Sequence, residues 1–493
     1  MSLDPRTPVL IGAGQLSHRA GNIADLLDPA AMLTEAVRRA ATDAGLTTVP
    51  QPDSWRVVSI LGWRPSDPAW VIAHQLGLEA RDTVVTTVGG NSPQSLVNAT
   101  AEEIRLGKVD LVVLMGGEAS RSRRLLKAAD TRPDWPTSPA DQVPRQMGED
   151  LVLAHPHEMS RGVIMPVQVY PMFETAIRAA AGRTVDEQQK VASELWARFS
   201  EVAANNPHAW IRTPMTAEQI RTPSEGNRMI GFPYTKSMNS NNHVDQAAAL
   251  IMCSAAKAEA LGVPRDRWVF PHSGTDCHEH LFVSERWSFA DTPAIRLGGR
   301  MALELAGITI DDVELIDLYS CFPSAVQLGA ASLGLSLERQ LTLTGGLTFA
   351  GGPWNNYVMH SIATMVGALR NADPGARGLI WANGGYVTKH AFGVYSCTPP
   401  TEGFRWAYPQ DEIDALPRRT LAEDGSGPAT VEAYTVMHSR EGLPETALAA
   451  VLLPDGRRAW GNSHDPALAA AMCEGEWVGR SVDLSAEGTI TAV

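Results

Sequence analysis

The stretch Gly89–Ser120, GGNSPQSLVNATAEEIRLGKVDLVVLMGGEAS, contains the pattern that decides the fold. It begins with a glycine-rich turn, continues through a helical stretch over 94–106, and ends in the apolar run Val109–Met115 before two glycines. Another apolar run, Asp82–Val88, precedes the turn. Strand, helix and strand at this spacing predict a parallel α/β layer, because parallel neighbours need a crossover helix between them.

The same alternation extends outward from this stretch. Pro8–Gln15 and Trp55–Trp63 are short apolar runs typical of buried strands, and Ala30–Gly45 between them has helical spacing that ends at a glycine. The alternation returns later, with a strand over Val313–Tyr319 and a helix over Cys321–Leu333. The sequence therefore predicts an α/β layer that the chain builds twice.

Two regions depart from the alternation. From about 121 to 245, prolines, arginines and histidines become frequent, which predicts a long functional excursion over the core. Residues 399–428 are rich in proline and acidic residues and predict a linker. Beyond it, Ala429–Met437 and Thr446–Leu453 flank a short turn, a pattern typical of an antiparallel β unit.

Composition excludes several classes of protein. The chain has 493 residues, 44% hydrophobic and 19% charged, as expected for a globular protein rather than a disordered one. A net charge of −14 without a basic block argues against a nucleic-acid partner. The five cysteines form no CxxC pair, so we expect a reduced, cytoplasmic setting without a disulfide framework. No apolar run approaches the ~18 residues that span a bilayer, so we expect no membrane partner.

Three glycine-flanked turns follow apolar strands, at residues 89–93, 351–353 and 382–385. In open α/β sheets, ligands collect at the carboxyl ends of strands, where the next helix presents free backbone N–H groups. The three turns either converge on one pocket or are ordinary strand–helix turns, and spacing alone leaves both interpretations open.

Taken in order, these segments resemble the signatures of the thiolase superfamily. The family's C-x-S-G segment, a later glycine and a strand ending in GG-x-E correspond here to Ser92, Gly107 and Gly116–Glu118. Its NEAF signature, which is HDCF in the sterol-carrier branch, corresponds to Tyr319–Phe322, which reads YSCF. Its NGGxxxxGHP signature corresponds to Thr344–Pro353, TGGLTFAGGP. These matches indicate an acetyl-CoA acetyltransferase-like chain of the sterol-carrier-type branch.

The resemblance continues to the end of the second layer. The family's C-x-G turn corresponds to Ala382–Gly385, and Val244–Leu250, VDQAAAL, is similar to the thiolase sDGAAA segment. Order and spacing hold over residues 8 to about 400. The remainder, residues 418–493, resembles the additional C-terminal domain of thiolase-like proteins type 1, and we call it the tail domain.

The resemblance implies an α/β fold in which two similar βαβαβαββ halves form a five-layered αβαβα core. The first half would comprise residues 1–120 and 245–290, and the second half residues 291–405. Residues 121–244 would form an inserted loop domain, which we call the loop domain throughout. The tail domain would be a small β-rich, OB-like unit, by its strand content.

The residues that carry thiolase chemistry are missing at their expected positions. The nucleophile position is Gly90, the GHP histidine position is Gly352, and the second cysteine position is Ala382. Thiolase chemistry needs a thiolate to carry the acyl group, a histidine to activate it and a second thiol to move a proton. Cysteine-based thiolysis or Claisen condensation is therefore not expected.

Three other side chains are the candidate catalytic groups. Tyr319 replaces the Asn or His of its signature, and its phenol would either act on a thioester oxygen or only fill space. His390 follows the fourth turn and would be a general base or a packed histidine, while Lys389 would point to the other face of a strand. Asn383 could offer its amide to an oxyanion.

The resemblance also implies a ligand. The loop domain of thiolases holds coenzyme A, so an acyl-CoA or CoA is the expected ligand, and a place in lipid metabolism follows from it. Arg121, Arg123 and Arg124 form a cluster that could pair with its phosphates or be solvated, and Gly346 and Ser92 lie in the matching signatures. The segment HSGTDCHEH at 272–280 suggests metal ligands at first sight, but no second cluster accompanies it, so we expect no metal.

Three functions remain open on the sequence alone. The chain could be an acyltransferase-like protein that acts on or binds acyl-CoA thioesters. It could be a non-enzymatic acyl-CoA-binding protein or subunit. It could also be a carbon–carbon lyase of the retro-aldol type on a CoA thioester. A monomer and a homodimer are both compatible with the sequence.

Overall fold

The first of the two core sheets contains the strands of the opening stretch. The structure is a computed structural model that describes residues 3–493. This sheet has the order β1-β8-β4-β2-β3-β5, in which β4, β2, β3 and β5 are parallel and β8 is antiparallel to both of its neighbours. Its strands are β1 (Pro8–Ser17), β2 (Ser54–Val57), β3 (Thr83–Thr86), β4 (Leu111–Ala119), β5 (Arg145–Met147) and β8 (Asp245–Ser254).

The second sheet repeats this arrangement. Its order is β10-β11-β12-β9-β13, with β10 parallel to β11 and β12 antiparallel to both neighbours. The same sequence of pairings joins β2, β4, β8 and β1, so the two halves share a topology. Its strands are β9 (Phe270–His278), β10 (Leu315–Leu318), β11 (Gly378–Gly384), β12 (Lys389–Ser396) and β13 (Arg405–Ala407).

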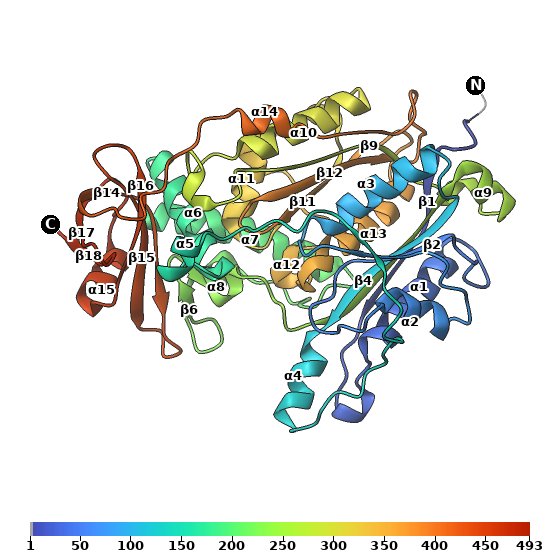
Figure 1. Ribbon diagram of the computed structural model, residues 1–493, viewed down its shortest axis with the longest axis horizontal. Helices are drawn as coiled ribbons and strands as arrows, with labels where there is room; N and C mark the ends of the chain where they lie inside the picture. Colours follow the sequence, from blue (N-terminus) through green and yellow to red (C-terminus); the bar gives the residue numbers. More distant parts are fainter. Residues whose placement is uncertain (1–2) are drawn as a thin grey trace.

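Helices separate and cover the two sheets (Figure 1). Helices α3 and α13 pack on each other and on strands of both sheets, so they form the middle layer. Helices α1 and α2 cover the outer face of the first sheet, and α10 and α11 cover that of the second. Their bounds are α1 (Pro29–Asp43), α2 (Pro68–Gln75), α3 (Ser92–Arg105), α10 (Pro293–Ala306), α11 (Pro323–Leu333) and α13 (Tyr357–Arg370). The predicted five-layered αβαβα core is confirmed.

Local sequence explains this layering. Strands β4 and β8 are buried along their whole length, as expected for sheets that helices cover on both faces. Helix α1 begins after Asp28, whose carboxylate accepts from Ala31 N, and it crosses β1 very closely. A Cβ on Gly12 would lie 2.1 Å from the Ala40 carbonyl oxygen, so only glycine allows this approach.

From residue 156 onward the loop domain lies between the core and the tail domain, whereas α4 projects from the core and residues 145–147 form β5 of the first sheet (Figure 1). Helix α6 packs on α11 of the core and on β14 of the tail domain, and α7 also packs on α11. Its elements are α4 (Ser120–Ala128), α5 (Pro156–Ser160), α6 (Pro166–Ala180), α7 (Val185–Asn205), α8 (Ala217–Arg221), β6 (Met229–Gly231) and β7 (Tyr234–Thr235).

The tail domain is a five-stranded barrel with OB-like connectivity. Strands β16, β15, β14, β17 and β18 are neighbours in that order, and a parallel bridge from Asn462 to Thr489 joins β16 to β18. Helix α15 connects β16 to β17, as in OB-folds. The bounds are β14 (Gly427–His438), β15 (Pro444–Leu452), β16 (Arg458–Ser463), α15 (Pro466–Glu474), β17 (Ser481–Leu484) and β18 (Ile490–Ala492). The β-rich, OB-like prediction is confirmed.

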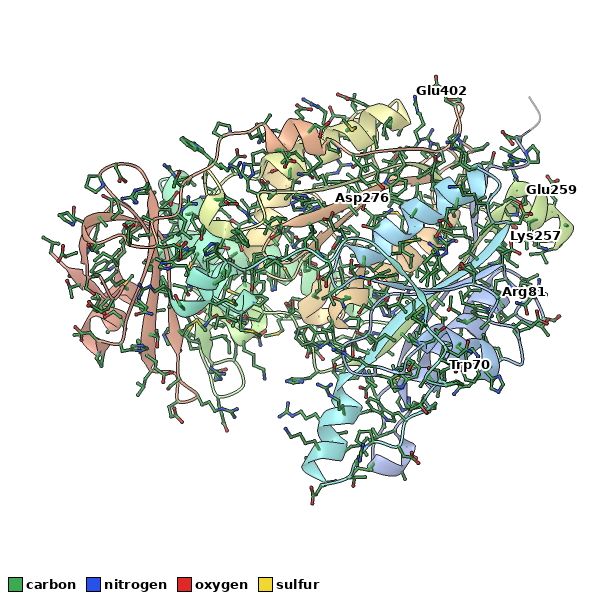
Figure 2. All side chains as sticks on the ribbon, viewed as in Figure 1. Trp70, Arg81, Lys257, Glu259, Asp276 and Glu402 are labelled. Carbon is green, nitrogen blue, oxygen red and sulfur yellow. The ribbon has the colours of Figure 1, made fainter. Side chains whose placement is uncertain are left out.

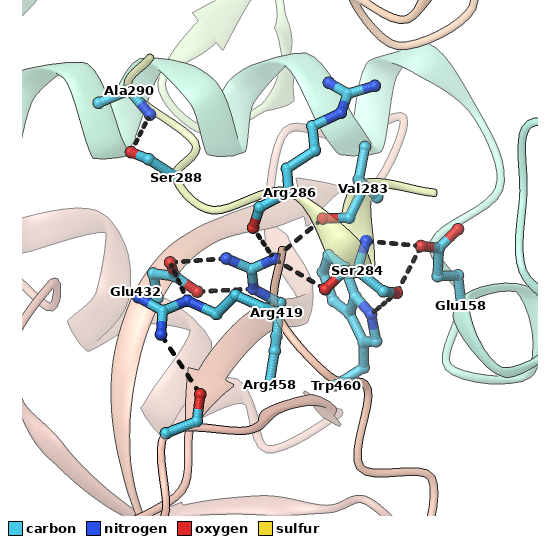
Figure 3. A network of polar contacts seen from close by, with 11 residues as sticks. Glu158, Val283, Ser284, Arg286, Ser288, Ala290, Arg419, Glu432, Arg458 and Trp460 are labelled. Carbon is cyan, nitrogen blue, oxygen red and sulfur yellow. Dashed lines mark hydrogen bonds and ion pairs between the residues drawn. The ribbon is translucent and has the colours of Figure 1, made fainter. Parts of the chain in front are cut away.

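A buried polar network fixes the tail domain to the core (Figure 3). Arg458 of β16 is fully buried and forms two hydrogen bonds with Glu432, each of 2.7 Å. Its guanidinium also donates to the main-chain oxygens of Val283, Ser284 and Arg286. Because these partners belong to the segment after β9, barrel and core are joined through desolvated bonds rather than through a flexible tether.

Two segments differ from their sequence interpretation. Residues 270–278, grouped above with the first half, form β9 in the second sheet. Eight of these nine residues pair with residues of β12. The predicted linker at 399–428 contains β13, which extends the second sheet beside β9, and α14 (Gln410–Asp414), which packs on α10. The first part of the linker therefore belongs structurally to the core, whereas its end bridges to the barrel through Leu421 and begins β14 at Gly427.

Candidate ligand-binding site

The turn between β3 and α3 is filled rather than open. A Cβ on Gly90 would lie 2.4 Å from the Tyr319 hydroxyl oxygen and 2.4 Å from the Asn383 carbonyl oxygen. Real Cβ atoms do not tolerate such distances, so the phenol occupies the space in which a side chain at residue 90 would stand. Gly90, Tyr319 and Asn383 thus lie together, as the four motifs predict, but they are in van der Waals contact instead of around an open space.

Tyr319 follows β10 and is almost completely buried. Its ring lies edge-on to that of Tyr357, with 5.6 Å between centroids. Burial first, and then the neighbouring Cys321 and Tyr357, raise the pKa of Tyr319 well above that of a free phenol. The hydroxyl is therefore neutral at physiological pH, able to donate a hydrogen bond but unsuited to act as a base.

Asn383 holds a turn against the loop domain. Its side-chain Nδ2 donates to the Tyr170 hydroxyl at 2.9 Å, and that hydroxyl donates to the Gly385 carbonyl oxygen at 2.9 Å. The hydroxyl also accepts from Val387 N at 3.1 Å. Ala382, at the second cysteine position, is fully buried. The Tyr170 hydroxyl thus joins β11 to α6, while Asn383 Oδ1 is buried without a hydrogen-bond partner.

His390 faces away from the Gly90 turn. Its neighbour Lys389 donates from Nζ to the Val88 carbonyl oxygen beside that turn. His390 lies on the opposite face of β12, where its Nδ1 accepts from Trp381 Nε1 at 3.3 Å, and the Trp381 ring packs against Gly329 of α11. Burial, with Arg286 nearby, keeps the pKa of His390 well below its usual range. The structure does not bring His390 and Tyr319 into one cleft.

The third signature ends at another filled position. A Cβ on Gly352 would lie 2.8 Å from Asn242 Oδ1, so an asparagine of the loop domain stands where the family histidine would project. Gly352 N also donates to the Asn241 carbonyl oxygen at 2.9 Å. Gly346, in the same signature, is buried against Phe199 and Ser320. Neither glycine opens a catalytic cleft.

The remaining predicted residues have separate positions. Ser92 is buried, and its hydroxyl donates to the Thr87 carbonyl oxygen at 3.0 Å, which closes the turn. Arg121 donates to the Ala20 carbonyl oxygen at 3.0 Å. Arg123 borders a shallow surface hollow with Lys127, apart from the cavities described next. The third member of this arginine cluster, Arg124, does reach a pocket.

A groove of about 1170 Å³ lies between the loop domain and the second half of the core. Its apolar wall includes Ile211, Met215, Phe349 and the partly exposed Trp354. At one end it includes Asn242, the residue that stands against Gly352. We call this cavity the groove.

A second cavity of about 590 Å³ adjoins the groove and is strongly cationic. Gly226, Ile230, Lys236 and His243 line both cavities, so the two form one continuous depression. We call it the basic pocket; its charged and titratable lining consists of Arg124, Arg228, Lys236, His243, Arg440 and Glu225. Sequence reasoning missed most of these residues, because they come from three separate segments, at 124, 225–243 and 440, and share no motif.

A third cavity of about 320 Å³ lies beside the amino end of α3. Asp276 of β9, labelled in Figure 2, borders it. The carboxylate accepts from Asn98 Nδ2 at 2.9 Å and from Trp406 Nε1 at 2.8 Å, and Ser95 also donates to it. Burial raises the pKa of Asp276, although these donors oppose the effect. The carboxylate thus accepts three hydrogen bonds, and Ser92, Lys389 and His390 border the same cavity.

The histidine-rich segment does not gather into a metal site. Within residues 3–493, no group of three or more His, Cys, Asp or Glu side chains is arranged to hold an ion. His272 Nε2 lies 2.7 Å from the Thr398 carbonyl oxygen, and Cys277 Sγ donates to that of Ala294. Over the same residues no helix is long and apolar enough to cross a membrane, and all five cysteines are free.

Comparison with known proteins identifies the family. The family model described as "Thiolase-like protein type 1 additional C-terminal domain" matches residues 409–489. The crystal structure of a monomeric SCP2-thiolase like protein type 1 from Mycobacterium smegmatis is similar over 100% of both chains, with 30% identity and a TM-score of 0.85. The chain belongs to the type 1 thiolase-like proteins. The recognition made from the four motifs and the tail domain is therefore confirmed.

More distant structures share the thiolase fold. The dimeric peroxisomal thiolase of Saccharomyces cerevisiae is 13% identical with a TM-score of 0.56, over 80% of this chain and 98% of that one. An acetyl-CoA acetyltransferase from Syntrophomonas wolfei is 17% identical with a TM-score of 0.56, over 79% of this chain and 99% of that one. About a fifth of this type 1 thiolase-like protein therefore has no counterpart in either.

Proposed function

We propose that this type 1 thiolase-like protein binds a coenzyme A thioester along the groove and the basic pocket without carrying out cysteine-based thiolase chemistry. The observation that supports this most directly is the continuity of a large apolar groove with a cationic pocket. Coenzyme A esters have the same division, with a long acyl-pantetheine arm at one end and several phosphate charges at the other. Apolar burial would hold the arm, and charge attraction would hold the phosphates.

The filled Gly90 turn favours binding over turnover. A general base for retro-aldol cleavage must accept a proton near neutral pH, and the raised pKa of Tyr319 makes its phenol a donor only. His390, with its depressed pKa, faces the outer helices. We therefore place the non-enzymatic binder ahead of the acyltransferase and of the lyase.

We also propose that the protein is a monomer. The edge of β3 is already paired with β5 of the same chain, through Val84, Val85 and Thr86. β3 therefore offers no free backbone groups to a second copy, and the sheet ends in the three-residue strand β5. The relative from Mycobacterium smegmatis is described as monomeric, which agrees with this proposal. Light scattering at micromolar concentration would measure the mass directly, and a dimer mass would contradict it.

Isothermal titration with acetyl-CoA, CoA and pantetheine tests the binding proposal. We expect saturable binding of both CoA forms and weaker binding of pantetheine, which lacks the nucleotide phosphates. Lys236→Ala should weaken CoA binding, because Lys236 lines both cavities, whereas Lys257→Ala, on α9 (Ala255–Ala260) at the far side of the core, should not. Absence of binding of all three compounds at millimolar concentration would overturn the proposal.

Hydrolysis of acetyl-CoA, measured by release of free thiol, and thiolysis of acetoacetyl-CoA by CoA, measured by consumption of free thiol, should both remain at the rate of the buffer. A rate that depends on protein concentration would contradict the view that the molecule only binds its ligand.

A further inference from the structure

We propose that the tail domain completes the ligand site, with Arg440 binding a phosphate group of the nucleotide end of the ligand. This inference rests on the proposed function and adds a residue that lies outside the thiolase-like core. Arg440 is in the turn that joins β14 to β15, far along the chain from the other residues of the basic pocket.

The turn that carries Arg440 is tightly ordered. Ser439 N donates to the Leu443 carbonyl oxygen at 2.9 Å, and Gly442 N donates to the Ser439 carbonyl oxygen at 3.2 Å. The Ser439 hydroxyl oxygen accepts from Glu441 N at 3.2 Å as well. Gly442 has a φ of +85°, which glycine adopts without strain. The backbone at Arg440 is thus held in one conformation, while its exposed side chain projects from the tip.

This turn is anchored to the loop domain beside the basic pocket. Met437 of β14 pairs with Gly231 of β6, so the tail barrel continues directly into the loop domain (Figure 1). Arg228 Nη1 donates to the Met229 carbonyl oxygen at 2.8 Å and to the Ser439 carbonyl oxygen at 3.3 Å. A hairpin of the tail domain and a strand of the loop domain therefore form one wall, on which both arginines are mounted.

The basic pocket carries more cations than carboxylates, although Glu225 lines it and Glu441 lies near Arg228 and Arg440. No ion pair within residues 3–493 involves Arg124, Arg228, Lys236 or Arg440, whereas many other arginines of the chain are paired, including Arg178, Arg457 and Arg458. Burial and the positive field of Arg124 and Lys236 lower the pKa of His243 in the same pocket. Clustered unpaired cations repel each other, and an anion that binds among them removes this repulsion.

Phosphate is the anion that this arrangement fits. A guanidinium presents a planar fork of N–H donors that matches two phosphate oxygens, and Lys236 adds a point charge at the boundary with the groove. A carrier with a phosphorylated nucleotide at one end and an apolar arm at the other would occupy the basic pocket and the groove together. The tail domain would then select for the phosphorylated end of the carrier.

The test compares Arg440→Ala with Arg457→Ala. Arg457 lies in the turn at the other end of β15 and pairs with Asp455 and Asp424, so it is a matched control from the same barrel. Titrations with CoA, dephospho-CoA and pantetheine should show at least tenfold weaker CoA binding for Arg440→Ala, with pantetheine binding unchanged. Arg457→Ala should bind all three like the wild type. Circular dichroism melts should coincide for the three proteins, because both side chains are at exposed turns.

The outcomes separate this inference from the proposed function. If the wild type binds CoA and Arg440→Ala binds it equally well, Arg440 does not contact the phosphates and the inference is wrong, while the binding proposal stands. If Arg440→Ala weakens pantetheine as much as CoA, the residue does not recognise phosphate, which also overturns it. If the wild type binds none of the compounds, the proposed function itself fails. A shallower dependence of CoA affinity on salt in Arg440→Ala would support the lost phosphate contact.

Discussion

The Gly90 turn and the groove belong to the same type 1 thiolase-like protein but have opposite designs. At the Gly90 turn, glycine is needed because Tyr319 and the Asn383 carbonyl oxygen leave no room for a side chain. In the groove, about 1170 Å³ stays open beside an unbalanced set of cations. The reaction centre implied by family resemblance is packed like a core, whereas the ligand-facing surface keeps the features of a binding site.

This contrast shows that a chain can keep the order of a family's motifs without keeping the residues that carry out its chemistry. The glycines at 89–90 and 351–352 still shape the turns that thiolases use, and each turn is now occupied by a side chain from another segment, Tyr319 or Asn242. The position of a residue in a family signature thus predicted the backbone conformation of its turn. The side chains that pack against the turn decide what the turn can do.

Gly90→Cys should have the largest effect, a loss of protein stability at the filled turn. Restoring the family nucleophile would force Cβ into the Tyr319 hydroxyl and the Asn383 carbonyl oxygen, so we expect the free energy of unfolding to fall by about 4 kcal/mol, at the upper end of overpacking effects. Urea denaturation would measure the loss. Adding Tyr319→Ala to Gly90→Cys should relieve part of the clash, and a single variant as stable as the wild type would show that the turn is not filled.

Glu118→Gln should change how stability depends on pH. Burial raises the pKa of Glu118 to about 7, although Leu61 N and Gly62 N donate to it. Its folded pKa exceeds the unfolded value, so its contribution is complete below about pH 4.5 and is lost as pH rises through about 7.

The wild type should therefore lose about 3 kcal/mol more than Glu118→Gln between pH 4.5 and pH 8. Urea melts at several pH values would measure the difference in slope. Parallel curves for the two proteins would mean that folding does not change the pKa of Glu118.

Trp354→Ala should weaken ligand binding in the groove. Trp354 lines the groove and is 40% exposed, so its ring is available to a ligand arm. We expect about tenfold weaker binding of acyl-CoA by titration, with a smaller loss for CoA, because the removed surface is apolar. Trp287→Ala, which removes another exposed tryptophan away from the groove, is the control. Equal affinities for Trp354→Ala and the wild type would place the acyl arm elsewhere.

Tyr319→Phe should have the smallest effect. The hydroxyl has no hydrogen-bond partner among residues 3–493, so its removal should change the free energy of unfolding by less than about 0.5 kcal/mol. Tyr357→Phe is the matched control, since that hydroxyl lies 2.6 Å from Thr344 Oγ1 and should cost about 1 to 3 kcal/mol. A large loss of stability in Tyr319→Phe would reveal a partner for the phenol.

The fold was predictable from short-range patterns to a large extent. Alternation around residues 82–120 predicted β3, α3 and β4, and the repeated alternation predicted the second sheet. The placement of β9 was not predictable, because its strand pairs with β12 more than a hundred residues later. Strand alternation correctly separated Lys389 from His390, but it could not say which face meets the Gly90 turn.

The candidate site was predictable only where a motif reports on backbone shape. Gly90, Gly352 and Ala382 follow from signature positions, whereas Asn242 and Arg440 do not, because their roles arise from packing of the loop domain and the tail domain against distant turns. Arg124 was noticed with Arg121 and Arg123, and the direction of each side chain on α4 then decided which one borders the basic pocket.

The pairing of β14 with β6 also has a consequence for biosynthesis. On the ribosome the loop domain emerges long before the barrel strand that extends its small sheet. Until β14 is made, the edge of β6 that faces it has no backbone partner, and the surface of α6 that packs on β14 is uncovered. Chaperones recognise such surfaces. A nascent chain of this protein therefore completes the basic pocket only after the hairpin of β14 and β15 has been translated.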